Sequence, residues 1–460
     1  MSDRPREVRR PVAIDLFCGA GGLSLGLESA GFDVVCSSDY DPVHAATHEF
    51  NFPKTKMLCG DISRLQGEDL LSGAAEGAEA HENSHWEGRV DLVAGGPPCQ
   101  GFSFIGKRLV DDERNRLVFH FFRVIRELLP RYFVMENVPG MASGGHRGVL
   151  EQLIQDFEGI GYRFPEGHWR ILNAAEFGVP QDRRRLFLIG AYQGEELVSP
   201  PDPTVAPAGG TRLSSENPDP DLPTGPTVWE AIGDLPNLNR YPTLLRSDCV
   251  SLGPEVLSRQ EELASAYARR LRELDVEKEI RTVPRTWERG VLTASARTSH
   301  SEESVRRFRR TKPGEVEPIS RFYRLPPSGL CNTLRAGTGS ERGAFTSPRP
   351  IHPYLPRVLS NREAARLHSL PDWFRPHATK WHGFRQIGNA VAPFVGTAVG
   401  RAVIDGLGAE PSRPEQEIQL GDPNLLKMTM KQATAYYRAD VTQIPAQRRR
   451  GALTQLPAVA

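Results

Sequence analysis

The stretch DLFCGAGG, residues 15–22, decides the fold class of this chain. It places a glycine-rich turn directly after the apolar run 12–17 and before a helical stretch, 23–30. Glycines at such a strand-to-helix turn let backbone amides approach a ligand closely. The spacing is not the full GxGxxG pattern, and a tight turn without a ligand needs the same glycines. From the turn alone, two interpretations are therefore equally favoured: that it binds a nucleotide-like ligand, or that it is a purely structural turn.

Strand-like and helix-like segments alternate through the first 190 residues. Apolar runs at 34–37, 90–94 and 132–135 are separated by helical or loop segments. Residues 117–129 carry one apolar helical face, and Pro130 ends that helix. Alternation of this kind predicts an α/β fold, with a parallel sheet covered by helices on both faces.

The length, charge and cysteine content indicate the size, expected partners and cellular compartment of the protein. The 460 residues suggest two to three domains, and 57 Lys plus Arg balance 57 Asp plus Glu, so nucleic-acid binding needs a local excess of positive charge. The six cysteines are scattered without a CxxC pair, which predicts a reducing compartment and no structural metal. No secretion signal follows Met1, and no run approaches the ~20 apolar residues of a membrane helix. We therefore expect a cytoplasmic protein that does not enter a membrane.

The middle of the chain differs from the first part. Eight of the 27 residues 200–226 are proline, which indicates a linker and a domain boundary near residue 195. Residues 254–280 are predicted to form one surface helix. Residues 281–312 hold nine Lys or Arg against three Glu, a local excess suited to nucleic acid. Further helices are predicted after Ser360 or Asn361, within 384–404, and over 424–438.

Three other segments carry chemistry. In GGPPCQGFS, residues 95–103, two prolines lock the backbone before Cys99, and flanking glycines let another molecule approach. This indicates a presented thiol, against the alternative of a small buried cysteine. Glu136 follows a third strand, so its carboxyl group is expected at the same sheet edge as Cys99. QDRRR, residues 181–185, offers guanidinium groups to phosphates or a base carbonyl, although an arginine run alone more often marks a solvated face.

Taken together, six segments resemble the DNA cytosine-5 methyltransferases of prokaryotic restriction–modification systems. They are DLFCGAGG, GGPPCQGFS, ENVPG, QDRRR, RVLSNREAARLHSLPDWF and QIGNAVAP, in this order. The resemblance covers roughly residues 11–190 and 351–405. It implies a Rossmann-like S-adenosylmethionine-dependent methyltransferase domain, a doubly wound mixed sheet, with a smaller inserted target-recognition domain. The predicted parts are 1–195 (catalytic, first part), 196–350 (linker and target recognition), 351–408 (closing segment of the catalytic domain) and 409–460 (tail).

The resemblance also implies catalytic residues. In that family a thiolate adds to carbon 6 of a cytosine flipped out of the duplex, and carbon 5 then takes a methyl group from S-adenosylmethionine. Cys99 matches the nucleophile, and Glu136 matches the acid that contacts ring nitrogen 3 and the amino group. Arg185 matches a donor to the ring carbonyl, and Arg183 a group near phosphate or the active site.

Cofactor and DNA contacts are implied in the same way. Phe17 and Tyr40 are expected to sandwich the adenine, Asp39 to hold the ribose and Asp61 to bind the adenine amino group. The other expected cofactor contacts are Gly19, Gly21, Leu23, Pro98, Asn389 and Val391. The expected DNA contacts are Ser103, Lys107, Arg108, Arg297 and Arg335. Double-stranded DNA is thus the expected partner of a monomeric enzyme, with a restriction endonuclease as a functional partner or a solitary regulatory role instead.

Three alternatives remain at this stage. A branch of the family methylates transfer RNA, but the large, locally basic insertion favours DNA. A catalytically silent binding module is disfavoured because Cys99, Glu136, Arg183 and Arg185 are all present. A nicotinamide oxidoreductase shares the glycine-rich turn but gives no reason for the Pro-Pro-Cys segment.

Overall fold

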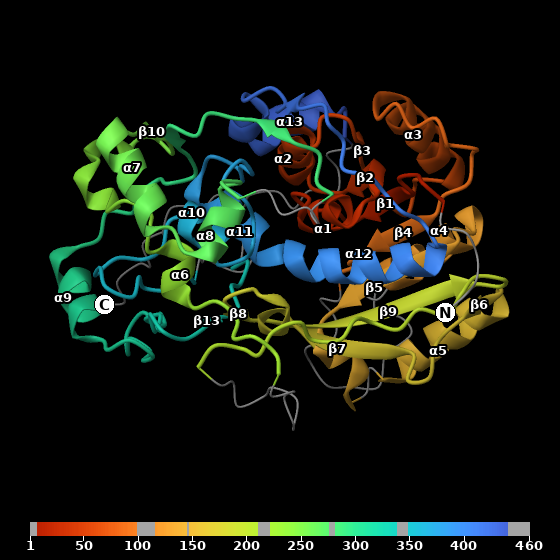
Figure 1. The fold of residues 1–460 in the computed structure, drawn as a ribbon, viewed down its shortest axis with the longest axis horizontal. Helices are drawn as coiled ribbons and strands as arrows, with labels where there is room; N and C mark the ends of the chain where they lie inside the picture. The colour runs from red at the N-terminus through yellow and green to blue at the C-terminus, as the bar shows by residue number, and fades with distance from the viewer. Residues whose placement is uncertain are drawn as a thin grey trace, which may run out of the picture.

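The computed structural model describes residues 7–98, 116–144, 147–209, 221–275, 281–337 and 348–439 (Figure 1). Its centre is an eight-stranded sheet in the order β3-β2-β1-β4-β5-β9-β6, with β7 also paired to β9. In that order, the strands are β3 (Lys56–Cys59), β2 (Asp33–Asp39), β1 (Val12–Leu16), β4 (Leu92–Gly95), β5 (Tyr132–Asn137), β9 (Arg184–Tyr192), β6 (Tyr162–Arg163) and β7 (Trp169–Asn173). The first five run parallel, and β9 runs antiparallel to β5, β6 and β7. The prediction of a doubly wound mixed sheet is confirmed.

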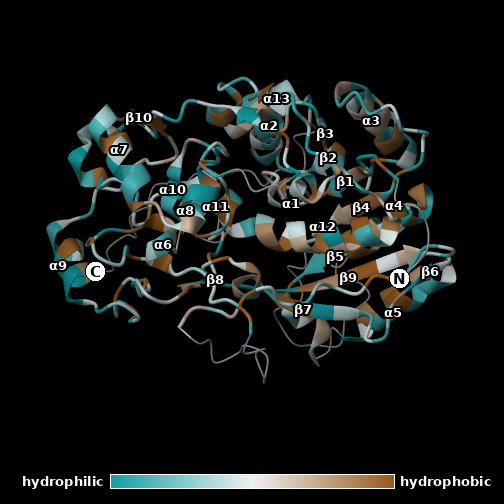
Figure 2. Cartoon of the chain, in the orientation of Figure 1, coloured by the Kyte–Doolittle hydropathy of each residue, from teal (hydrophilic) through white to brown (hydrophobic). Residues whose placement is uncertain are grey.

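Helices cover both faces of this sheet, which explains why β1 is buried along its whole length and is apolar except for Asp15. On one face, α1 (Gly22–Ala30) and α12 (Pro393–Leu407) share a hydrophobic core with the sheet. On the other face lie α3 (Gly67–Ala80), α4 (Arg116–Leu128) and α5 (Arg147–Gly159). Figure 2 shows hydrophobic residues along β9, beside helices that carry both hydrophobic and hydrophilic residues. The helix predicted over 117–129 is therefore confirmed as α4.

Helix α12 brings the end of the chain back to its beginning. It lies along α1, and a Cβ added at Gly26 would stand 2.6 Å from the Cα of Gly396. Two glycines facing one another let the helix backbones approach more closely than any side chain permits. Together, α11 and α12 span residues 380–407, a stretch long and apolar enough to cross a membrane, but 61% of its apolar window is buried inside the protein. We therefore interpret it as part of the core.

The middle of the chain forms a second, mostly helical unit beside the sheet (Figure 1). Its helices are α6 (Val228–Ile232), α7 (Pro254–Leu263), α8 (Ala266–Leu271), α9 (Glu302–Arg310), α10 (Asn361–Arg366) and α11 (Lys380–Asn389). Its short strands form the pairs β10 (Val250–Ser251) with β12 (Val291–Leu292), β11 (Arg285–Thr286) with β14 (Ile418–Gln419), and β8 (Gln181–Asp182) with β13 (Cys331–Asn332). One hydrophobic cluster joins Val228, Trp373 and Phe384 of this unit to Leu25 and Phe52 of the first. The two units thus share a continuous core.

The single helix predicted over 254–280 is wrong. The chain forms α7 and α8 instead, because Ala264 is extended and Ser265 caps a new helix by accepting a hydrogen bond from the amide of Ala268. Residues 276–280 lie outside the described residues. The helix predicted over 424–438 is likewise divided, into a 3-10 turn, Leu425–Lys427, and α13 (Met430–Tyr436). The capping of α10 by Ser360 agrees with its prediction.

We expect Gly26→Ala to destabilise the protein by about 1–3 kcal/mol, because the added methyl group overlaps Gly396 at the crossing of α1 and α12. Gly148→Ala in α5 is the matched control, since a Cβ at Gly148 meets no atom within 4 Å. It should leave stability unchanged or raise it by up to about 1 kcal/mol. Urea unfolding of both variants makes the comparison. Equal stability of Gly26→Ala and wild type would contradict the close crossing.

Candidate active site

The glycine-rich turn is held by Asp39 at the carboxyl ends of β1 and β2. The carboxylate accepts hydrogen bonds from the amide of Gly19 at 2.9 Å and from the amide of Asp41 at 2.8 Å. Burial raises the pKa of Asp39 above its ordinary value. Phe17 and Gly19 both adopt positive φ, near 58° and 57°, so the chain turns sharply here. These constraints fix the backbone before any ligand binds.

The neighbouring strand ends bring Tyr40 and Asp61 to the same edge. Tyr40 is exposed, and Asp61 accepts a hydrogen bond from the amide of Ser63 at 2.9 Å. A Cβ added at Gly19 or Gly60 would meet no atom of the described residues within 4 Å, so this part of the structure leaves open space beside both backbones. A backbone cradle flanked by an aromatic ring and carboxylates fits a nucleoside ligand. Phe17, Asp39, Tyr40 and Asp61 therefore lie at or just after the carboxyl ends of three adjacent strands, and their binding of a cofactor stays a prediction.

The far end of the chain also reaches this turn. A Cβ added at Gly22 would stand 2.5 Å from the carbonyl oxygen of Val391, so the segment after α11 lies directly against the turn. Asn389 is exposed at the end of α11. Gly21 faces Phe52, and Leu23 is buried in the core beneath α1. The structure thus brings Val391 to the glycine turn, whereas the side chain of Leu23 supports it from within the core.

A second group of residues lies where β4, β5 and β9 meet. Arg185 Nε stands 2.9 Å from Glu136 Oε1, and these side chains are 20% and 12% exposed. A Cβ added at Gly96 would lie 2.8 Å from Glu136 Oε2, so the loop after β4 passes directly over this carboxylate. Asn137 holds the same loop by donating to the carbonyl oxygen of Pro97 at 3.2 Å. The pair Glu136–Arg185 is thus accessible, fixed, and adjacent to the loop that leads to residue 99.

Several predicted residues lie outside the part of the chain that the structure describes. They are Cys99, Ser103, Lys107 and Arg108. Pro98, the last described residue of its loop, is exposed. The position of Cys99 next to Pro98 in the chain therefore remains the basis for placing the thiol near Glu136.

Arg183 points inward rather than toward a ligand. Its guanidinium donates to the carbonyl oxygens of Leu334 at 3.2 Å, Gly388 at 3.0 Å and Ala390 at 2.9 Å. Burial lowers its pKa to about 9. His368 Nε2 lies 2.9 Å from the same Ala390 oxygen. Arg183 therefore joins the middle of the chain to the segment after α11, which is a positioning role.

The two predicted DNA contacts of the middle unit differ in environment. Arg297 donates to Asn239 Oδ1 at 2.8 Å, and Lys380 donates to the backbone oxygen of Arg297 at 3.0 Å. Burial, followed by the charge of Arg349, lowers the pKa of Lys380. Arg335 is exposed, and its backbone packs against Gly388, one residue before Asn389. Arg335 therefore stands at the junction of the two units.

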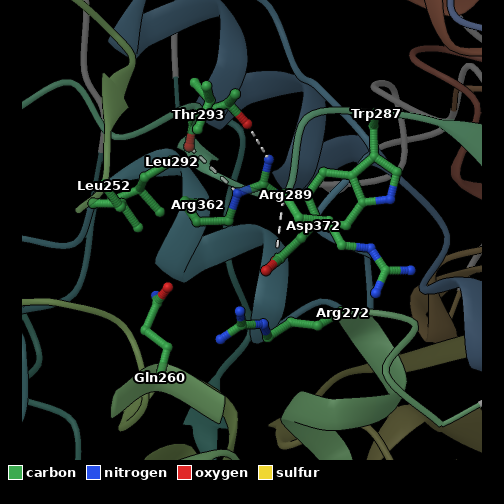
Figure 3. A pocket seen from close by; sticks show the side chains of 10 residues that line it. Leu252, Gln260, Arg272, Trp287, Arg289, Leu292, Thr293, Arg362 and Asp372 are labelled. Carbon is green, nitrogen blue, oxygen red and sulfur yellow. Dashed lines mark hydrogen bonds and ion pairs between the residues drawn. The ribbon is translucent and has the colours of Figure 1, made fainter. Parts of the chain in front are cut away.

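A pocket in the middle unit involves none of these residues (Figure 3). Arg362 crosses it, donating to Thr293 Oγ1 at 2.7 Å and approaching Asp372 at 3.6 Å. The lining residues are Leu252, Gln260, Arg272, Trp287, Arg289, Val291, Leu292, Thr293, Arg362 and Asp372. The charged groups of this pocket are thus engaged in structural pairs.

Sequence reasoning missed a buried polar chain beneath the glycine turn. Ser24 donates to Asp15 Oδ2 at 2.6 Å, and His48 Nε2 lies 2.9 Å from Ser24 Oγ. Asp15 Oδ1 is buried and has no hydrogen-bond partner among the residues that the structure describes. Burial raises the pKa of Asp15 to about 7 and lowers that of His48 to about 3. The only available signal was an acidic residue inside an otherwise apolar strand.

A family model, related sequences and a solved structure that resemble this chain are all described as DNA methyltransferases. The family model described as C-5 cytosine-specific DNA methylase matches residues 12–405. The Type II methyltransferase M.XorII of Xanthomonas oryzae pv. oryzae is 47% identical over 435 residues, 95% of this chain and 94% of that protein. M.AgeI of Thalassovita gelatinovora is 30% identical, over 85% of this chain and 98% of that protein. A crystal structure described as a DNA modification methyltransferase from an E. coli prophage matches with a TM-score of 0.64 and 30% identity, covering 86% of this chain and 99% of its own.

The raised pKa of Asp15 predicts a pH-dependent stability. The folded state binds the Asp15 proton more tightly than the unfolded state, so stability declines as pH rises from about 4 through about 7. Between pH 5 and pH 7.5, the free energy of unfolding should therefore fall by about 2–4 kcal/mol less in Asp15→Asn than in wild type. Urea unfolding at the two pH values measures it. Glu158→Gln, on the exposed face of α5, is the control, and an unchanged profile for Asp15→Asn would disprove the assignment.

Proposed function

This chain belongs to the C-5 cytosine-specific DNA methylase family and is a DNA cytosine-5 methyltransferase, and from this premise we propose that it methylates a cytosine flipped out of duplex DNA. The proposed methyl donor is S-adenosylmethionine, and the proposed nucleophile is Cys99. The observation that carries the proposal is the Glu136–Arg185 pair, 2.9 Å apart, beside the loop that leads to Cys99.

The cofactor fits the edge formed by β1, β2 and β3. Asp39 and Asp61 offer carboxylates to the ribose hydroxyls and the adenine amino group, and Phe17 and Tyr40 offer rings for stacking. The open space beside Gly19 and Gly60 leaves room for the ligand. S-adenosylmethionine supplies an electrophilic methyl group when bound.

The chemistry then falls to residues of β4, β5 and β9. The thiolate of Cys99 forms a bond to carbon 6 of cytosine, and the electron pair displaced from the 5,6 double bond makes carbon 5 nucleophilic. Glu136, as the protonated acid, donates its proton to ring nitrogen 3 and accepts a hydrogen bond from the amino group, and Arg185 donates to the ring carbonyl oxygen, so both offset the developing negative charge. Carbon 5 would take the methyl group of S-adenosylmethionine, whose sulfur would keep the electron pair of the broken bond and leave as a neutral thioether. A base or water removes the carbon 5 proton, the double bond re-forms, and Cys99 leaves as the thiolate.

The biological setting follows from the relatives. M.XorII and M.AgeI are named as Type II methyltransferases, so we propose that this enzyme protects a short DNA sequence from a partner restriction endonuclease. A monomer acting on DNA in the cytoplasm satisfies this role. Its sequence specificity is proposed to reside in the middle unit, as in the predicted target-recognition part 196–350.

Cys99→Ala should abolish methylation while changing the dissociation constant for S-adenosylmethionine less than about twofold, because the thiol attacks the base and does not hold the cofactor. Purified enzyme is incubated with the cofactor and duplex DNA of mixed sequence, and 5-methylcytosine is measured by mass spectrometry. Transfer RNA serves as the second acceptor. Turnover by Cys99→Ala would exclude the mechanism, and methylation of transfer RNA alone would exclude the DNA substrate.

Arg335→Ala should weaken DNA binding and reduce the slope of log affinity against log salt by about 1, as expected for the loss of one phosphate contact. The reason is that Arg335 is exposed where the two units meet. Arg163→Ala, at the outer edge of the sheet on β6, is the control and should keep the wild-type slope. The measurement is fluorescence anisotropy with labelled duplex at several salt concentrations. Identical slopes for both variants would place the DNA elsewhere.

A further inference from the structure

The segment after α12 crosses the protein and lies on α2 (Pro42–Asn51), as Figure 1 shows for α13. We call its residues 418–439 the C-terminal strap. It begins with β14, and the amide of Gly421 then donates to the carbonyl oxygen of Phe50 at 2.8 Å. Leu425 and Leu426 are buried against Ala46 and Phe50 of α2. The strap is therefore packed along its length rather than trailing from the fold.

The strap is also fixed to the segment that precedes α11. The amide of Ala378 donates to the carbonyl oxygen of Leu426 at 2.9 Å, and His377 Nε2 lies 3.1 Å from the carbonyl oxygen of Met428. Thr429 then caps α13. The strap thus joins α2 to the part of the chain that leads to Asn389.

Two tyrosines of the strap bind one carboxylate of α2. Tyr436 donates its hydroxyl to Glu49 Oε1 at 2.7 Å, and Tyr437 donates to Oε2 at 2.6 Å. The hydrogen bond to Glu49 raises the pKa of Tyr436 to about 12, and burial, followed by the same bond, raises that of Tyr437 further. Both phenols therefore remain protonated donors at neutral pH.

The two rings differ in where they lie. Tyr436 is 52% exposed, whereas Tyr437 is partly buried and packs against the hydrophobic cluster of Cys18, Ala45 and Met57, as does Cys59. Cys18 precedes Gly19, and Cys59 precedes Gly60, the two glycines beside which the structure leaves open space. Tyr437 therefore packs on the same cluster as Cys18 and Cys59, the residues that precede these two glycines. Helix α2 is held at its other end, where Arg385 contacts Asp41 at 3.0 Å.

We propose that the C-terminal strap completes the cofactor site, with Tyr437 as a positioning residue whose ring holds the ends of β1 and β3 in the geometry that binds adenosine. This rests on the proposed cofactor function of that edge. Tyr437 touches protein and not cofactor, so its effect is preorganisation. When the ring is absent, the two strand ends gain freedom that the ligand must remove on binding, and affinity falls.

The test compares full-length wild type with Tyr437→Ala, Tyr437→Phe and Tyr436→Ala by calorimetric titration of S-adenosylmethionine. Tyr437→Ala should weaken binding about fivefold or more, and Tyr437→Phe, which keeps the ring, should recover most of the affinity. Tyr436→Ala is the matched control, because it removes a hydrogen bond to the same carboxylate from the exposed ring. It should stay within about twofold of wild type. In turnover, Tyr437→Ala should raise KM for the cofactor while kcat and KM for DNA stay unchanged.

Two results would overturn the proposal. One is a folded Tyr437→Ala protein with wild-type affinity, and the other is an equal loss in Tyr436→Ala, which would assign the effect to Glu49 rather than to the ring. Should Tyr437→Ala not fold, hydrogen exchange of wild type decides: S-adenosylmethionine should slow exchange in 430–437 but not in α7, and equal exchange refutes the strap's role. A wild-type protein that fails to bind S-adenosylmethionine would instead refute the proposed cofactor.

Discussion

The close crossing of α1 and α12 is the constraint on which the remaining structure depends. Gly26 and Gly396 let the two helix backbones meet, so the last helix of the catalytic unit completes a layer that the first helix begins. The segment between β9 and α11, residues 193–379, must then extend away from the sheet and return to it. The crossing also brings Val391 against the glycine turn. The glycine turn and the segment around Val391 therefore meet only when both ends of the chain have folded together, so the proposed cofactor site depends on packing at the crossing of α1 and α12.

Buried charges hold the middle unit in place on this framework. Glu28 of α1 accepts two hydrogen bonds from Arg285, and both side chains are almost fully buried. Arg366 and Asp234 form a second fully buried pair, which lies within the middle unit itself. Removing one partner of such a pair costs about 3–5 kcal/mol, because the other charge stays buried and unpaired. Since the geometry of the Glu28–Arg285 pair is specific, this contact fixes how the middle unit sits against α1 more precisely than the hydrophobic cluster that joins the two units.

The sequence predicts what local pattern controls and misses what distant contacts control. The sheet, the glycine turn and the edge shared by Asp39 and Glu136 follow from apolar runs and from the rule that parallel strands end on one side. The inward orientation of Arg183 does not follow, because a buried arginine and a solvated one look alike within QDRRR. Nor does the break at Ser265, where a cap overrides an amphipathic pattern. The position of the C-terminal strap depends on contacts with α2, nearly 400 residues earlier in the chain. The spacing of apolar residues along the sequence does not predict contacts between segments so far apart.

The depth at which Glu136 and Arg185 lie supports the proposed extrusion of the target base. Glu136 is only 12% exposed, with Arg185 against one oxygen and the Gly96 backbone near the other. A cytosine stacked and paired within a duplex presents neither its ring nitrogen 3 nor carbon 6 outward, so it cannot reach a carboxylate this deep. A flipped base can, and it would meet groups that are already fixed: Arg185 holds Glu136, and Asn137 holds Pro97. The cost of unstacking is then offset by contacts that need little further ordering, which is how a preorganised site favours the transition state over the ground state.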